Sequence, residues 1–364
     1  MSTNNGKICY HVKKIRKSNN NFFWSERILF VKQAKDDSIV VVLSAICGNL
    51  LLTIAKLFGW LISGSPSMLA EAIHSFADTA NQGLLYIGIQ HSRGGPSREF
   101  PWGQSASRYL WNLISAVGIF FIGFGVTTYH GVGSLFKFHE TLLPKLYWLP
   151  ITILTLSFFV EGYVLLIAYK KIKKKQGRRS LKNIILSGDD PTIVAVLLED
   201  SIAVLGVITA LAGLWLSHLY QSPVPDAIAS IVIGILLGIM AVLLAFVNGR
   251  LLIGMAVSET KENDIRHYIE VYPSVEKVIS LKTQILGPNQ VKLTAEIEFH
   301  GGIMFDRKQV ESDADLIRQG EEPLPILVDT IERTVRVVGN EINRLERAIR
   351  EQFPEITSIS LEVY

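Results

Sequence analysis

Hydrophobic residues gather in runs of about twenty between residues 38 and 250, and short polar segments separate the runs. A helix rises ~1.5 Å per residue, so a run of this length crosses a hydrocarbon layer ~30 Å thick. Glycine and proline mark several of the breaks, as at Gly64-Ser65-Pro66 and Gly94-Gly95-Pro96. The pattern predicts six membrane-spanning helices, at about 38–62, 66–91, 108–135, 146–170, 191–218 and 225–248.

The pattern changes after residue 255, where polar and apolar positions mix as in a soluble domain. The periodicity predicts a helix, two strands, a second helix and a last strand, at 259–271, 277–286, 290–299, 326–352 and 356–363. This order indicates a small α/β domain over 255–364. The acidic segment 301–325 shows no clear period, so we interpret it as an insertion or lid whose acidic residues form a solvated loop rather than a metal site.

Composition and charge support the membrane assignment of 38–250. Hydrophobic residues make up 49% of the chain and charged residues 19%, which is unlike a disordered or extracellular protein. The net charge is +3, but Lys and Arg lie in alternate links between the apolar runs, which predicts both termini on the same side of the membrane. Nucleic-acid binding is therefore not expected. Cys9 and Cys47 are too few for a disulfide framework or a cysteine-based zinc cluster.

A basic tail, 1–37, precedes the first predicted span. Its first 25 residues contain Lys, Arg, Asn and Ser but no acidic residue. This composition is compatible with a mitochondrial targeting segment and equally with a plain basic tail.

Ionisable side chains inside the predicted spans are candidates for function, because burying a charge in a bilayer is costly unless the charge is paired or hydrated. The candidates are Lys56, Glu71, His74, Asp78, His130, Glu161, Glu199, Asp200 and Asp226. We interpret Asp226 as a cap at the start of the sixth helix. His130 is compatible with helix packing, a proton relay or metal binding.

His74 and Asp78 are four residues apart and therefore lie on one helix face. Imidazole and carboxylate together suit a divalent ion, Zn²⁺ first, with Mn²⁺, Fe²⁺ and Co²⁺ as alternatives. A hydrogen-bonded clasp between the two side chains is the other interpretation. Glu199 and Asp200 place two more carboxylates in the fifth apolar run, where they need a cation, a proton or a partner.

Four segments resemble the cation diffusion facilitator family, and within it the zinc transporter nine subgroup. They are SMLAEAIHSFADTANQGLL (67–85), YHG (129–131), DDPT (189–192) and LLEDSIAVLG (197–206). The resemblance covers about 36–364. It implies six membrane helices, a C-terminal ferredoxin-like domain, a homodimer, and export of Zn²⁺ in exchange for protons across a mitochondrial membrane.

The family's transport site takes a His and an Asp from the second helix and an Asp from the fifth, which correspond to His74, Asp78 and Asp200. The usual fourth ligand precedes the last Asp by four residues, where this chain has Val196. The resemblance therefore leaves the fourth position to Glu199, Glu161 or water, and Glu199 has the alternative of pairing with Lys56 or a neighbouring helix.

The loop after the second helix also departs from the family pattern. Many members have a His-Pro-aromatic-Gly sequence that contributes to a second metal site, whereas this chain has FPWG at 100–103. We therefore expect no metal site there, despite His91 nearby.

These observations predict a transporter with zinc as its cargo and no catalytic cofactor. Metal binding needs a neutral imidazole and ionised carboxylates, so protons and zinc compete for the site, which predicts antiport. The expected partners are Zn²⁺, H⁺, the lipid bilayer and a second copy of the chain. The alternative is a non-transporting zinc-binding or regulatory subunit that lost a ligand at position 196. An intramembrane metalloprotease is not favoured, because the sequence has no His-Glu-x-x-His motif.

Overall fold

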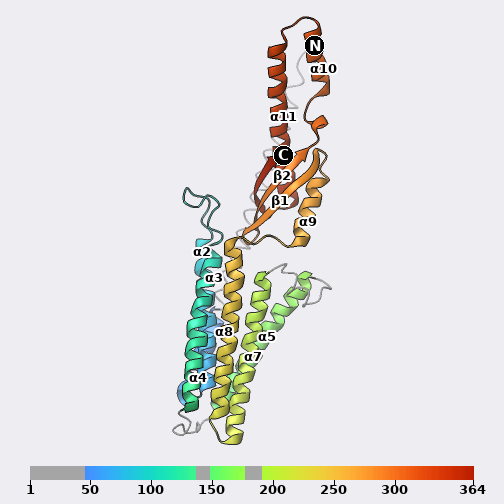
Figure 1. The fold of residues 1–364 in the computed structure, drawn as a ribbon. Coiled ribbons are helices and arrows are strands. Elements are labelled where there is room, and N and C mark those ends of the chain that lie inside the picture. The colour runs from blue at the N-terminus through green and yellow to red at the C-terminus, as the bar shows by residue number, and fades with distance from the viewer. Residues whose placement is uncertain (1–45, 137–147, 177–190) are drawn as a thin grey trace, which may run out of the picture.

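The computed structural model describes residues 46–136, 148–176 and 191–364, and it consists of a bundle of long helices with an α/β domain at one end (Figure 1). The predicted basic tail, 1–37, lies outside the described residues. The helices of the bundle are Ile46–Ser63, α2 (Pro66–His91), α3 (Ser107–Gly118), α4 (Thr127–Phe136), α5 (Trp148–Gln176), α7 (Pro191–Tyr220) and α8 (Val224–Ile253). A π-helical stretch, Ile119–Val126, joins α3 to α4, so these form one continuous helix.

Within the described residues, five helical segments are long and apolar enough to cross a membrane. They are Ile46–Ser63, Ser107–Phe136, Trp148–Lys170, Leu197–Tyr220 and Val224–Ile253. They match five of the six predicted spans, although the start of the first lies outside the described residues. The remaining predicted span, 66–91, is the second along the chain. It corresponds to α2, which has the predicted bounds but is more polar than the other five.

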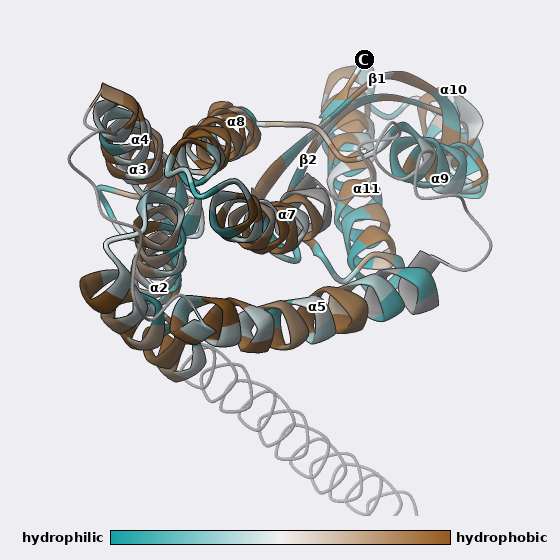
Figure 2. Cartoon of the chain, turned by 90° about the horizontal axis from the view of Figure 1, so that it is seen from below, coloured by the Kyte–Doolittle hydropathy of each residue, from teal (hydrophilic) through white to brown (hydrophobic). Residues whose placement is uncertain are grey.

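α8 lies at the centre of the bundle, in contact with α2, α3, α4 and α7. Its buried residues Ile233, Leu237 and Met240 pack with Met68 of α2 and Leu154 of α5 in one hydrophobic core. The outer faces of the helices carry large exposed apolar side chains, including Phe121, Phe159, Trp215 and Phe246. Figure 2 shows the bundle as predominantly hydrophobic and the C-terminal helices as more hydrophilic. An apolar outer face suits contact with lipid rather than water.

The C-terminal domain contains a three-stranded sheet in the order β1-β2-β3 (β1 Val275–Gly287, β2 Gln290–Phe299, β3 Ile356–Val363). β1 and β2 pair antiparallel, and β2 and β3 pair parallel. Helices α9 (Glu259–Glu270) and α11 (Pro323–Gln352) contribute Ile265, Ile269, Leu345 and Ile349 to the core beneath the sheet. Alternate residues of β2 are buried, as the sequence pattern predicted.

The prediction of a loop over 301–325 is wrong. The segment begins with a short 3₁₀ turn and continues as helix α10 (Arg307–Arg318), and α11 starts at Pro323. Two of the acidic residues form ion pairs within α10. Glu311 pairs with Arg307 at 3.2 Å, and Asp315 pairs with Arg318 at 2.8 Å.

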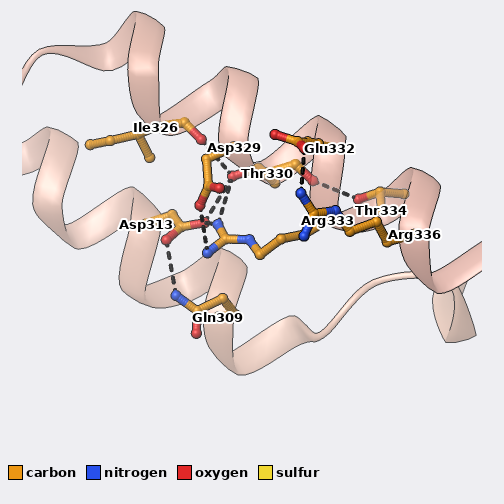
Figure 3. Close-up of polar contacts among 9 residues, drawn as sticks. All are labelled: Gln309, Asp313, Ile326, Asp329, Thr330, Glu332, Arg333, Thr334 and Arg336. Atoms are coloured by element: carbon orange, nitrogen blue, oxygen red, sulfur yellow. Dashed lines mark hydrogen bonds and ion pairs between the residues drawn. The ribbon is translucent and has the colours of Figure 1, made fainter.

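Asp313 joins α10 to α11 (Figure 3). Its carboxylate accepts hydrogen bonds from Thr330 at 2.8 Å and Gln309 at 3.2 Å, and it pairs with Arg333. The hydrogen bond from Thr330 and the other donors hold the pKa of Asp313 below its usual value. Asp313 thus connects α10 to α11 and serves a structural role.

Candidate metal centre

A polar stripe runs along α2 inside the bundle. Glu71, His74, Asp78 and Gln82 follow one another at intervals of three or four residues, which places them within ~80° of one another around the helix axis. Glu71 and His74 are 0% and 1% exposed. The helix begins with Ser65, whose hydroxyl accepts from the Met68 amide, followed by a proline. This start fixes α2 so that the stripe faces its neighbouring helices.

The side chains of the stripe retain unused hydrogen-bonding atoms. Glu71 Oε1, both ring nitrogens of His74, Asp78 Oδ1 and Gln82 Oε1 are buried and have no hydrogen-bond partner among the described residues. Buried polar atoms without a partner are costly, and here five of them follow one another along a single helix face. Carboxylate oxygens, amide oxygens and imidazole nitrogens are also the atoms that bind divalent ions.

His74 and Asp78 lie side by side, with 3.6 Å between Nε2 and Oδ2. This separation is longer than a hydrogen bond, so the two residues do not form the hydrogen-bonded clasp considered as the alternative. A separation of this size leaves both side chains with atoms available for a shared ion.

The acidic residues of α7 lie on the helix that packs against α2. Glu199 accepts a hydrogen bond from Asn81 of α2 at 3.0 Å. Asp200 is within electrostatic range of Asp78 and Glu199. Across the described part of the chain, however, the structure contains no group of three or more His, Cys, Asp or Glu side chains close enough to enclose a metal ion. The predicted ligands therefore adjoin one another without forming a closed coordination shell.

A second charged group lies beside the stripe. The ammonium of Lys56, on the first described helix, lies 2.7 Å from Glu71 Oε2 and 2.8 Å from Glu161 Oε1. Lys56 thus pairs with these two acids, and the alternative that Lys56 pairs with Glu199 is wrong. The same contact occupies one oxygen of Glu161, while Glu161 Oε2 has no hydrogen-bond partner among the described residues.

Gly206 of α7 allows Glu71 to approach that helix. A Cβ atom at Gly206 would lie 2.5 Å from Glu71 Oε1, which is closer than real Cβ atoms come to other atoms. The missing side chain therefore makes room for the carboxylate between α2 and α7.

Asp226 differs from its predicted role. Pro223 is the residue at the N-cap of α8, and Asp226 lies one turn further on, in the first turn of the helix. Its buried carboxylate accepts from the Ser67 hydroxyl of α2, and its amide donates to Ser217 at 3.0 Å. Asp226 therefore links α8 to α2 and α7 and does not cap its own helix.

The sequence interpretation missed two features of the centre. Asn81 and Gln82 belong to the polar face of α2, and the continuing spacing of 74, 78 and 82 was the available signal. The three-residue group of Lys56, Glu71 and Glu161 was also missed, although each member was a candidate on its own.

The bundle of apolar helices with ionisable groups in its interior defines a multi-pass membrane protein that handles a polar or ionic cargo. The chain belongs to the cation efflux family, because residues 42–253 match the cation efflux transmembrane domain. This is a family of transporters and not of enzymes, and the match confirms the resemblance to cation diffusion facilitators.

Several relatives from animals and plants are similar over most of the chain. The proton-coupled zinc antiporters SLC30A9, mitochondrial, of Xenopus laevis and Homo sapiens are both 33% identical over 332 residues, 89% of this chain. The chain spans only 59% and 58% of the length of these two relatives. Metal tolerance protein C4 of Arabidopsis thaliana is 33% identical over 360 residues, 95% of this chain and 78% of that protein. The names of the two animal proteins describe mitochondrial zinc antiporters, and the name of the plant protein describes metal tolerance.

Proposed function

We propose that this protein exports Zn²⁺ in exchange for protons across a mitochondrial membrane, with the metal bound between α2 and α7. The membrane domain comprises 38–250, and α2 crosses the membrane together with the five apolar helical segments, which makes six spans. The soluble domain comprises 255–364 and is ferredoxin-like with α10 as an insertion, since the order α9, β1, β2, α11 and β3 corresponds to the last five elements of the βαββαβ unit.

The observation that carries the proposal is the row of unpartnered buried atoms on α2. The His74 imidazole and one oxygen of Asp78 have no hydrogen-bond partner in the described structure, and they lie on the side of α2 near the carboxylates of α7. A Zn²⁺ ion would satisfy these atoms with donors that it prefers. Zinc binding in a closed shell requires α7 to move toward α2 until Asp200 and Glu199 also reach the ion.

Proton exchange follows from the chemistry of this donor set. Zinc binds neutral imidazole and ionised carboxylates, so the ion and protons exclude each other from His74, Asp78 and Asp200. If the bundle opens alternately to the two sides of the membrane, the site carries zinc one way and protons the other way.

Glu199 is the best supported fourth ligand. It lies on α7 next to Asp200, within electrostatic range of Asp78 and His74, and among the described residues its carboxylate accepts a hydrogen bond from the neutral amide of Asn81. Glu161 is held by the Lys56 ammonium, and a metal ion close to that cation would be repelled.

The names of the two animal relatives support zinc as the cargo and protons as the coupled ion. The exposed apolar side chains along α11 support assembly of two copies, because Leu324, Leu327, Ile331 and Val335 repeat at three- or four-residue spacing on one side of the helix. A molecular mass near that of two chains, by light scattering of the purified protein with the detergent contribution subtracted, tests this part of the proposal.

The transport proposal is tested by zinc flux into proteoliposomes under an imposed pH gradient. The wild type is expected to take up zinc when the imposed gradient drives protons out of the vesicles. His74→Ala and Asp78→Asn are expected to abolish this uptake. His267→Ala is the matched control, since His267 is an exposed histidine of α9. Zinc binding without flux in the wild type would favour the alternative of a regulatory subunit. Flux that ignores the pH gradient would refute antiport.

A further inference from the structure

A cavity of about 760 Å³ lies where the membrane bundle meets the C-terminal domain. Its walls come from the end of α2 and the loop that joins α2 to α3, from the start of α3, from the turn between β1 and β2, and from β3 with the end of α11. A direct contact joins the two sides, because the Ser105 hydroxyl of the α2–α3 loop donates to the side-chain carbonyl of Gln290. The cavity is thus bounded by both domains.

The lining of the cavity is positively charged. Arg93, Arg108 and Arg350 line it, and none of the lining residues is acidic. Arg350 pairs at 3.5 Å with Glu346, whereas Arg93 and Arg108 form no ion pair in the part of the chain that the structure describes. Two guanidinium groups without a carboxylate therefore face a space large enough for a ligand.

Arg108 is the most constrained of the three. Its Nε atom is buried and has no hydrogen-bond partner among the described residues, and its Nη2 atom makes only a 3.3 Å contact with the Ser92 hydroxyl. A buried charged N–H group without an acceptor is costly, so an anion within reach of Nε would stabilise it. Hydroxyl groups of Thr357 and Ser358 line the same cavity and supply further donors, whereas the Ser92 hydroxyl already donates to the Ile89 carbonyl.

The position of the cavity along the bundle points to the membrane surface. α2 ends at His91 and α3 begins at Ser107, so the loop between them lies at the level where the spanning helices emerge. Trp102 in this loop is 55% exposed, and the Lys292 ammonium lies 4.1 Å from the centre of its ring. Exposed tryptophan and basic residues are typical of the zone of lipid headgroups.

We propose that this cavity binds a phosphate group, and that Arg93, Arg108 and Arg350 are its main ligands. Guanidinium groups match the geometry of phosphate oxygens, and three of them with hydroxyl donors suit a phosphate ester better than a carboxylate. The headgroup of an anionic phospholipid and a soluble phosphate both carry this chemistry. A bound phosphate joins the α2–α3 loop to β3 and α11, so it would restrain the C-terminal domain relative to the helix that carries His74 and Asp78. The proposal stands independently of zinc transport.

The test uses the full-length protein purified in neutral detergent, with phosphatidylglycerol, phosphatidylcholine or inorganic phosphate added in separate arms. Binding is measured by native mass spectrometry and by the midpoint of thermal unfolding. We expect wild-type protein to bind phosphatidylglycerol or phosphate, and the double variant R93Q/R108Q to bind about tenfold more weakly, since two charge-assisted contacts are lost. Arg98→Gln is the matched control, because Arg98 is an exposed arginine of the same loop outside the cavity lining.

A second variant covers the case in which R93Q/R108Q does not fold. Ser358→Glu adds a carboxylate from the β3 side of the cavity, leaves all three arginines in place and is expected to weaken binding similarly. Tight binding of phosphatidylglycerol alone identifies a lipid site, and equal protection by inorganic phosphate identifies a soluble ligand. The proposal is overturned if neither phosphatidylglycerol nor inorganic phosphate binds, or if Arg98→Gln weakens binding as much as the cavity variants do.

Discussion

The Lys56 ammonium lies 2.7 Å from the Glu71 carboxylate, and both side chains are 0% exposed. Glu161 approaches the same ammonium from α5 at 2.8 Å, so the lysine connects three helices of the bundle. A charge in this position is tolerated because it is paired, and removing one member leaves the others buried without compensation. The group therefore contributes to holding the helices around the candidate metal centre.

Replacing Lys56 is expected to destabilise the protein strongly. Lys56→Met leaves Glu71 and Glu161 without their cation, which costs about 3–5 kcal/mol for a buried pair. Chemical unfolding of the purified protein in detergent, followed by helical circular dichroism, measures the loss. Lys261→Met is the control, because its pair with Glu355 is 40% and 24% exposed and is expected to contribute about 1 kcal/mol or less.

Two further variants separate charge from packing in this group. Adding Glu71→Gln and Glu161→Gln to Lys56→Met removes the uncompensated charges and is expected to restore part of the stability. Equal losses in Lys56→Met and Lys261→Met would contradict the assigned role of Lys56.

Adding a methyl group at position 206 is expected to disturb the centre. The Cβ of Gly206→Ala would lie 2.5 Å from Glu71 Oε1, so the carboxylate or α7 must shift, at a cost of about 1–3 kcal/mol. Gly133→Ala is the matched control in a membrane helix, since nothing lies within 4 Å of a Cβ there. Thermal unfolding and zinc titration of both variants check the prediction. Unchanged stability and zinc affinity in Gly206→Ala would show that α7 does not need this glycine.

Local sequence patterns predicted most of the elements. The bounds of α2 and β3 agree with the predicted ranges 66–91 and 356–363, because a proline or an alternating pattern marks them directly. α10 was missed because the sequence does not show that two of its acidic residues pair within the helix and that Asp313 bonds to α11. A local signal was present, because Asp306 accepts from the Lys308 amide at the N-cap and Gly320 has a positive φ of 98° after the helix.

The site was predictable only where it depends on one helix. The spacing of His74 and Asp78 placed both on one face, and the structure has them adjacent. The pairing of Lys56 with Glu161 joins residues 105 positions apart, and it depends on how three helices pack. The sequence shows that such charges need partners but does not show which partners they have.

Acid is expected to loosen the connection between α10 and α11. The pKa of Asp313 lies below its ordinary value of 3.8 because Thr330, Gln309 and Arg333 stabilise the carboxylate. This contribution to stability is therefore complete above the unfolded value and is lost as the pH falls through the folded value. Hydrogen exchange of α10, corrected for the intrinsic rate, should show full protection at neutral pH and reduced protection below about pH 4.

The Asp313→Asn variant should lose protection of α10 already at neutral pH. Asp315→Asn is its control, because Asp315 is 60% exposed and pairs only within α10. If both variants exchange alike, Asp313 does not hold the two helices together.

The contacts of Glu199 and Glu161 predict different effects on zinc binding. Among the described residues, the Glu199 carboxylate bonds to the Asn81 amide, which leaves it available to a metal ion. If Glu199 is the proposed fourth ligand, Glu199→Gln is expected to weaken zinc binding at least about tenfold. Glu161 is held by Lys56, so Glu161→Gln is expected to lower stability while zinc affinity stays within about threefold. Isothermal titration of zinc into each purified variant, with thermal unfolding alongside, distinguishes the two. The reverse pattern would assign the fourth ligand to α5, and it would imply that zinc displaces the Lys56 ammonium when it binds.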